Sequence, residues 1–324
     1  MLVDVLVLLG GLALVILGAE WLVDGASSIA RKAGLSEFLI GMTIVGIGTS
    51  MPELVVSLTG ALKGNADIAI GNVVGSNIFN VLMILGVTAL ISPISITREN
   101  KRRDIPLNIL ATVLLICFGM QHTLFGVGGS DTINALEGGV FLILFAAYMY
   151  LSFKTGNVGD EKEEESEKES TKDRSVFVAV LMVIAGLAGL VFGGDVFVDS
   201  ACRIALEAGL SDKFVAITIL AGGTSLPELV TCVVAAAKNK GALALGNIIG
   251  SNISNILLIL GASALACPLS FANMKVVDLG VITLSSVMLL VSAWTGRDNK
   301  ISRWDGASYL LIFAAYMAYL ILTI

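Results

Sequence analysis

The chain has 324 residues, of which 56% are hydrophobic and only 14% are charged, and its mean hydropathy is +0.90. No soluble globular domain has this composition. Most of the net charge of −6 comes from one acidic run, DEKEEESEKE at residues 160–169, so it does not describe the rest of the chain.

Ten apolar stretches follow one another along the chain, each of about 18 to 25 residues and so long enough to cross a bilayer as a helix. We therefore predict an all-α polytopic membrane protein, because a transmembrane β-barrel would show weaker alternating segments of about ten residues. The first stretch carries Asp4 and Glu20 and lacks a basic start, so we interpret it as a mature span rather than a secretory signal. The stretches lie near residues 2–22, 38–62, 68–92, 105–126, 136–153, 176–198, 214–237, 242–266, 276–295 and 306–324.

Lys and Arg residues are distributed unevenly between the two sets of alternate loops. With the N-terminus outside, the loops on the cytoplasmic side hold 16 of the 20 Lys and Arg residues. The positive-inside rule then predicts that both termini lie outside and that the acidic linker, residues 156–175, lies in the cytoplasm. The predicted location is the cell (inner) membrane.

The chain also repeats itself on either side of the acidic linker. Residues 18–93 align without a gap with residues 193–268 at an offset of 175, and residues 145–149 recur at 313–317. We predict two five-span repeats, residues 1–155 and 176–324. An odd number of spans inverts the second repeat, as in many secondary transporters whose substrate site lies near the midplane between the repeats.

Each repeat places one glutamate in the middle of a predicted span, within GTSMPEL at 48–54 and GTSLPEL at 223–229. Ionisable groups at bilayer depth are costly and by default mark an ion or substrate path. Positions i, i+1 and i+4 of a helix face roughly one way, so each glutamate shares a polar patch with two hydroxyl groups. The patches are Thr49, Ser50 and Glu53, and Thr224, Ser225 and Glu228.

Prolines accompany both glutamates, at Pro52 and Pro227. Proline removes an intrahelical hydrogen bond, so we expect nearby carbonyls, including those of Gly46 and Ala221, to turn away from the helix axis. Broken helix at membrane depth is tolerated only where it is buried in protein or lines a cavity. Hydroxyl, carbonyl and carboxylate oxygens suit hard cations such as Ca²⁺ and Na⁺, and argue against zinc or copper.

The following span of each repeat adds a second polar stripe with a spacing of four residues. Such a stripe can serve close helix packing or cation binding, and opposite a carboxylate we favour amide oxygens as cation ligands at Asn80 and Asn255. For Asn72 and Asn247 the two interpretations remain equally open. The stripes are Asn72, Ser76 and Asn80, and Asn247, Ser251 and Asn255.

These motifs, GIGTSMPEL with GNVVGSNIFN and AGGTSLPEL with GNIIGSNISN, resemble the two repeats of the calcium/cation antiporter superfamily, in its prokaryotic sodium/calcium exchanger branch. The resemblance implies alternating-access exchange of Na⁺ for Ca²⁺, with no cofactor beyond the transported ions. It implies Ca²⁺ ligands at Glu53, Glu228, Thr49 and Thr224, with Asn80 completing the centre. It implies Na⁺ ligands at Ser50, Ser76, Ser225, Ser251 and the carbonyls of Gly46 and Ala221.

One departure from that family concerns Asn255, where many members have an aspartate. The two glutamates alone give the site a charge of −2. The absence of a third acid is expected to weaken Ca²⁺ binding or to change the ion count, which leaves the preferred cation open.

Three other functions remain as alternatives. Proton-coupled cation antiport would use the same glutamates, since buried carboxylates can carry protons. An intramembrane protease also needs two buried acids, but the motif around Asp195 matches poorly, so we predict no enzyme. A passive channel is the third. The predicted partners are Ca²⁺, Na⁺ and the lipid bilayer, and we predict no nucleic-acid partner. The oligomeric state is left open.

Overall fold

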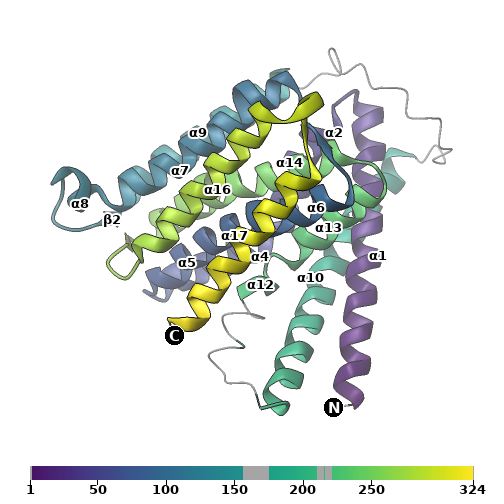
Figure 1. Ribbon diagram of the computed structural model, residues 1–324, viewed down its shortest axis with the longest axis horizontal. Coiled ribbons are helices and arrows are strands. Elements are labelled where there is room, and N and C mark those ends of the chain that lie inside the picture. The colour runs from purple at the N-terminus through teal and green to yellow at the C-terminus, as the bar shows by residue number, and fades with distance from the viewer. Residues whose placement is uncertain (1, 156–174, 210–214, 216–220, 324) are drawn as a thin grey trace.

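The computed structural model describes residues 2–155, 175–209, 215 and 221–323, and these are almost entirely helical (Figure 1). Seven helices in this part are long and apolar enough to cross a membrane, or eight if the bent pair Glu37–Thr49 and Met51–Leu62 is one span. The predicted all-α polytopic membrane fold is therefore confirmed. The seven are α1 (Leu2–Ala33), Ala66–Ile91, α9 (Ala135–Thr155), α10 (Val176–Glu207), Gly241–Ala266, α16 (Val276–Thr295) and α17 (Arg303–Leu322). The predicted acidic linker lies outside the described residues except for Ser175.

Several spans consist of consecutive helical segments that differ in geometry. π-Helical turns interrupt three of them, and such turns occur frequently at functional sites. The first chain of segments is α2 (Glu37–Ile40), η1 (Gly41–Val45), α3 (Gly46–Thr49) and α4 (Met51–Leu62). The others are α5 (Ala66–Ile78), η2 (Phe79–Ile84) and α6 (Leu85–Ile91), and α14 (Gly241–Ile253), η5 (Ser254–Leu260) and α15 (Gly261–Ala266).

Two predicted spans differ from expectation. The stretch near 105–126 is not one helix, because η3 (Asn100–Asp104) and α7 (Ile105–Gly119) end before Met120 and the short, exposed α8 (Gln121–Phe125) follows. The stretch near 214–237 is described only at Val215, α12 (Ala221–Gly223) and α13 (Leu226–Ala237).

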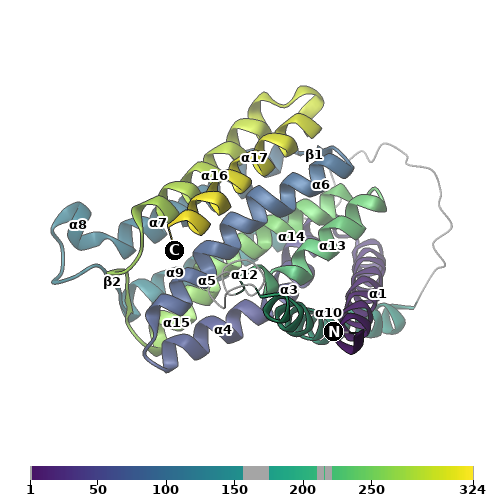
Figure 2. The ribbon, with the colours of Figure 1, turned by 60° about the horizontal axis from the view of Figure 1, so that its bottom comes forward.

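Helices α1 and α10 form an antiparallel pair, and each is longer than its predicted span. Figures 1 and 2 show them side by side, standing out from the remaining helices. Small residues at intervals of seven bring the backbones into contact: a Cβ added at Gly18 would lie 2.8 Å from the carbonyl oxygen of Gly186. Close approach of this kind is how small residues stabilise helix pairs in membranes. The other facing positions are Gly11 with Gly193 and Gly25 with Ala179.

Two short strand pairs join the repeats, and the sequence did not predict them. β1 (Ile94–Ser95) pairs antiparallel with β4 (Lys300–Ile301), directly after the 3₁₀ turn η6 (Arg297–Asn299). β2 (Thr132–Ile133) pairs with β3 (Leu269–Ser270). The segment after β1 also contacts the segment before β4, since Lys101 Nζ donates to Asn299 Oδ1 at 2.7 Å. These two-residue strands are small additions to a fold that is otherwise all-α, as predicted.

Candidate cation site

The helix that carries Glu53 breaks immediately before it. Segments Glu37–Thr49 and Met51–Leu62 meet at 46°, and Ser50 at the junction has φ −83° and ψ 7°. Pro52 thus lies in the first turn of α4 rather than inside one continuous helix. There proline costs no hydrogen bond, because the first-turn N–H groups have no helical partner.

The second repeat has the same arrangement. Ser225 precedes α13 with φ −90° and ψ 8°, and Pro227 lies in the first turn of that helix. The predicted interruption is therefore present in both repeats. Each proline lies in the first turn of the helix that follows the break, and not in the interior of one continuous helix as expected. Each glutamate consequently occupies the first turn of a helix, where the macrodipole favours negative charge.

Each glutamate accepts a hydrogen bond from a serine hydroxyl group of the other repeat. Ser50 Oγ donates to Glu228 Oε1 at 3.0 Å, and Ser225 Oγ donates to Glu53 Oε1 at 3.0 Å. Both glutamate side chains are only 1% exposed. The structure thus brings four of the predicted ligands into one buried cluster, with a matching contact from each repeat.

Each glutamate retains one buried carboxylate oxygen, Oε2 in both cases, that has no hydrogen-bond partner within the described part of the chain. The Oδ1 atoms of Asn80 and Asn255 have the same status. Buried polar atoms are normally paired, so four such oxygens among the predicted ligands require an explanation.

The amide nitrogens of these two asparagines are engaged by a second pair of asparagines. Asn80 Nδ2 donates to Asn252 Oδ1 at 3.1 Å, and Asn255 Nδ2 donates to Asn77 Oδ1 at 3.0 Å. Each amide nitrogen is therefore engaged, while the described residues offer no donor to either Oδ1 atom. Asn80 and Asn255 lie in the π-helical turns η2 and η5, a geometry that hydropathy does not reveal.

Three further predicted ligands, Thr49, Ser251 and Gly46, lie where α14 packs against η1 and α3. Thr49 Oγ1 lies 3.0 Å from Val45 O and 3.2 Å from Asn247 Oδ1, either of which can accept its hydrogen. Ser251 Oγ donates to Gly46 O at 3.2 Å. The Gly46 carbonyl also accepts the helical hydrogen bond of Ser50 N at 3.2 Å, so it does not turn away from the axis as expected.

The last three predicted positions are less fully defined. Thr224 is half-buried, and its Oγ1 donates to Asn72 Oδ1 at 3.5 Å. Ser76 is buried in α5, 3% exposed. Ala221 begins α12, and its side chain lies outside the described part.

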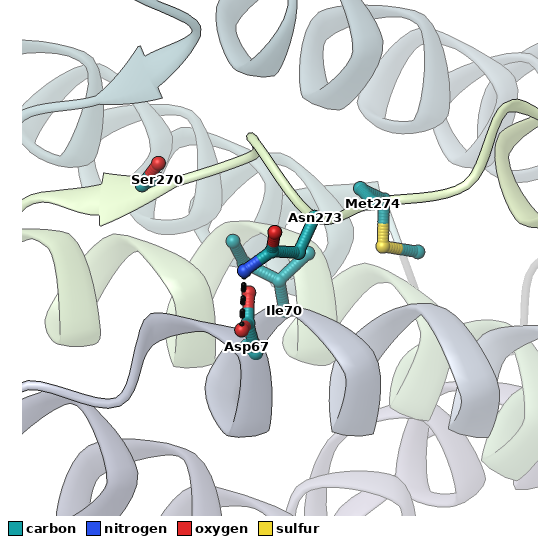
Figure 3. Close-up of a pocket in the computed structure, with 5 residues that line it drawn as sticks. All are labelled: Asp67, Ile70, Ser270, Asn273 and Met274. Atoms are coloured by element: carbon teal, nitrogen blue, oxygen red, sulfur yellow. Dashed lines mark hydrogen bonds between the residues drawn. The ribbon is translucent and has the colours of Figure 1, made fainter.

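A separate cavity of about 210 Å³ lies beside β3 and the start of α5 (Figure 3). Asn273 Nδ2 donates there to Asp67 Oδ2 at 2.9 Å. The lining residues are Asp67, Ile70, Ser270, Asn273 and Met274, none of which is a predicted ligand.

The apolar spans and the buried, oxygen-rich cluster between repeats define a polytopic membrane transport protein. The chain belongs to the sodium/calcium exchanger protein family, whose sequence pattern matches residues 3–154 and 178–322. It is therefore a cation antiporter and not an enzyme, as predicted, and the family transports its ions without a cofactor.

Relatives that span nearly the whole chain support this assignment. The uncharacterized membrane protein MJ0091 of Methanocaldococcus jannaschii is 37% identical over 95% of both chains. The sodium/calcium exchanger MaX1 of Methanosarcina acetivorans is 35% identical over 98% of both. A solved structure of the sodium-calcium exchanger NCX_Mj, soaked with Na⁺ and Ca²⁺, matches with a TM-score of 0.82 and 33% identity over 98% of each chain.

Proposed function

We propose that this chain exchanges Na⁺ for Ca²⁺ across the cell membrane by alternating access, with Glu53 and Glu228 as the shared central ligands. The observation that carries the proposal is a set of four buried oxygens that have no partner among the residues that the structure describes, on Glu53, Glu228, Asn80 and Asn255. Carboxylate and amide oxygens are the ligands that Ca²⁺ takes in proteins.

Charge explains why the site would exchange ions rather than release one and return empty. The two carboxylates give −2 when both are ionised, and one Ca²⁺ or two Na⁺ neutralises them. An uncompensated charge inside a membrane protein is costly, so the empty site resists moving through a dry barrier. Movement is then tied to occupancy, and Ca²⁺ and Na⁺ compete for the same oxygens.

Na⁺ would use the hydroxyl and carbonyl groups around this centre. The serine pair Ser50 and Ser225 already contacts the glutamates, so their oxygens lie beside the negative charge. Thr49 and Thr224 would join the glutamates as Ca²⁺ ligands. The further Na⁺ ligands would be Ser76, Ser251, Gly46 and Ala221.

The proposed architecture is ten spans in two inverted repeats, residues 1–155 and 176–324, with both termini outside and the acidic linker cytoplasmic. The antiparallel packing of α1 on its repeat mate α10 supports opposite orientation of the two halves. In alternating access this pair would slide as one unit past the site-bearing helices. Its glycine-lined contact would keep it together during the movement.

The decisive experiment measures radioactive Ca²⁺ uptake into proteoliposomes loaded with Na⁺. We expect uptake that requires an outward Na⁺ gradient and disappears in Glu53→Gln and Glu228→Gln. The control is liposomes with equal Na⁺ on both sides. Uptake driven by a pH gradient in the absence of Na⁺ would instead select proton-coupled antiport through the same site.

A further inference from the structure

A polar or thiol side chain follows each glutamate by one helical turn. Ser57 comes four residues after Glu53 in α4, and Cys232 comes four residues after Glu228 in α13. The repeat offset of 175 relates the two positions, and both side chains are fully buried at 0% exposure. The two positions are equivalent in the repeat, but one carries a hydroxyl group and the other a thiol.

Each of these side chains accepts a hydrogen bond from an asparagine of the following helix. Asn72 Nδ2 donates to Ser57 Oγ at 2.9 Å, and Asn247 Nδ2 donates to Cys232 Sγ at 3.3 Å. The same contact thus occurs in both repeats, once with oxygen and once with sulfur.

The other end of each amide meets a predicted cation ligand of the opposite repeat. Thr224 Oγ1 donates to Asn72 Oδ1 at 3.5 Å, and Thr49 Oγ1 lies 3.2 Å from Asn247 Oδ1. Two chains of contacts result, Ser57–Asn72–Thr224 and Cys232–Asn247–Thr49. Each connects a position behind a glutamate to a threonine beside the site.

We infer that Ser57 and Cys232 are positioning residues of the cation site, which fix the amide orientation of Asn72 and Asn247 and thereby the hydroxyl orientation of Thr224 and Thr49. This inference rests on the proposed function of the site. A threonine that donates to an amide oxygen keeps its lone pairs for a cation. A flipped amide would direct N–H groups at that hydroxyl and compete with the cation for the same lone pairs.

The sulfur makes the two halves of the site unequal. A thiol sulfur is a weaker acceptor than a hydroxyl oxygen. Asn72 Nδ2 also lies 3.2 Å from the carbonyl oxygen of Glu53, which gives it a second acceptor. The Asn247 amide nitrogen therefore has the weaker acceptor, while Asn247 Oδ1 has a second neighbour in Ser251 Oγ at 3.4 Å.

The test compares Ca²⁺ binding by purified full-length protein in four variants: Cys232→Ala, Cys232→Ser, Ser57→Ala and Ser57→Cys. Removing a group that orients a metal ligand typically costs about 10- to 100-fold in affinity. We expect losses of roughly tenfold in both alanine variants, at the lower end of that range. Cys232→Ser restores the acceptor and is expected to bind at least as tightly as the parent chain, and Ser57→Cys is expected to lie between parent and alanine variant.

The matched control is Cys117→Ala, which removes a half-buried thiol from α7 outside the proposed site. Cation-free melting temperatures identify any general loss of packing, and Ser57→Ala remains informative if Cys232→Ala does not fold. Parental affinity in both alanine variants, or an equal loss in Cys232→Ser and Cys232→Ala, overturns the positioning role and leaves the exchanger proposal standing. A parent chain that binds no Ca²⁺ overturns both.

Discussion

Lys238 Nζ lies 2.7 Å from Asp24 Oδ1, and this ion pair joins α1 to the C-terminal end of α13. The repeat offset relates the pair to Lys63 and Asp199. No ion pair joins Lys63 to Asp199, although both lie in the described part of the chain. The structure therefore forms only one of the two ion pairs that the repeat would allow between these described residues. This ion pair, Lys238 with Asp24, joins α1 to the site-bearing helices at the end that we assign to the cytoplasm.

We expect Lys238→Gln to shift the protein toward the state that is open at this end. The pair is partly exposed, and such pairs contribute about 0.2–1 kcal/mol, so the population should change by roughly 1.4- to 5-fold. The measurement is the rate at which an impermeant thiol reagent labels a cysteine placed at Ser27 in a cysteine-free background, applied from each side. Lys63→Gln is the control, and the exchanged pair Asp24→Lys with Lys238→Asp should restore the parental rate. Unchanged labelling in Lys238→Gln would show that the contact does not hold α1.

The α1–α10 contact predicts strong intolerance to side chains at Gly18. Because a Cβ there would lie 2.8 Å from Gly186 O, Gly18→Leu must force the two backbones apart. Overpacking typically costs about 1–3 kcal/mol, so we expect a lower melting temperature and lost exchange. Gly10→Leu is the control, since no atom lies within 4 Å of its added Cβ. Equal stability of the two variants would contradict close packing of α1 on α10.

The crossed serine–glutamate contacts predict a reciprocal pair of phenotypes. Ser50→Ala removes a hydrogen bond from Glu228, and Ser225→Ala removes one from Glu53, both at 3.0 Å. We expect each variant to weaken Na⁺ competition against Ca²⁺ by about tenfold, as for loss of a hydrogen bond to a charged group. Ser27→Ala serves as control, because the buried Ser27 hydroxyl has no hydrogen-bond partner in the part of the chain that the structure describes. Strongly unequal effects of the two site variants would argue that the serines do not occupy equivalent places.

Much of the site follows from spacing alone. Thr49, Ser50 and Glu53 fall on one helix face, and the duplication at 224, 225 and 228 predicts a partner for each. What spacing leaves open is how the two patches meet. The crossed contacts Ser50–Glu228 and Ser225–Glu53 depend on how the halves pack, so the repeat indicates two equivalent patches without their mutual arrangement.

Other features had weaker signals or none. Strands β1 and β4 are far apart in sequence and only two residues long. They are therefore too short to show the alternation of apolar and polar residues that predicts a strand. The π-helical turns at Asn80 and Asn255 are adjustments of the main chain that leave hydropathy unchanged. Ser57 and Cys232 had a signal in the repeat alignment, one turn after each glutamate. The substitution of sulfur for oxygen obscured it.

Asn255→Asp tests the charge of the site directly. Among the described residues the side-chain oxygen at this position has no partner, and a carboxylate there would add a third negative charge to the proposed site. Ligand charge tunes Ca²⁺ affinity, so we expect binding tighter by about tenfold or more. Isothermal titration with Ca²⁺ measures it.

The gain at Asn255 should be limited by its neighbour. Asn255 Nδ2 donates to Asn77 Oδ1 at 3.0 Å, and an aspartate has no hydrogen to offer, so two oxygens would face each other unless the Asn77 amide turns. Turning it sacrifices the bond from Asn77 Nδ2 to Asn252 O, 3.2 Å long. We therefore expect Asn255→Asp combined with Asn77→Ser, whose hydroxyl can donate, to bind Ca²⁺ more tightly than Asn255→Asp alone, with Asn77→Ser alone as control. Superimposable isotherms for the parent chain and Asn255→Asp would mean that position 255 does not contact the ion.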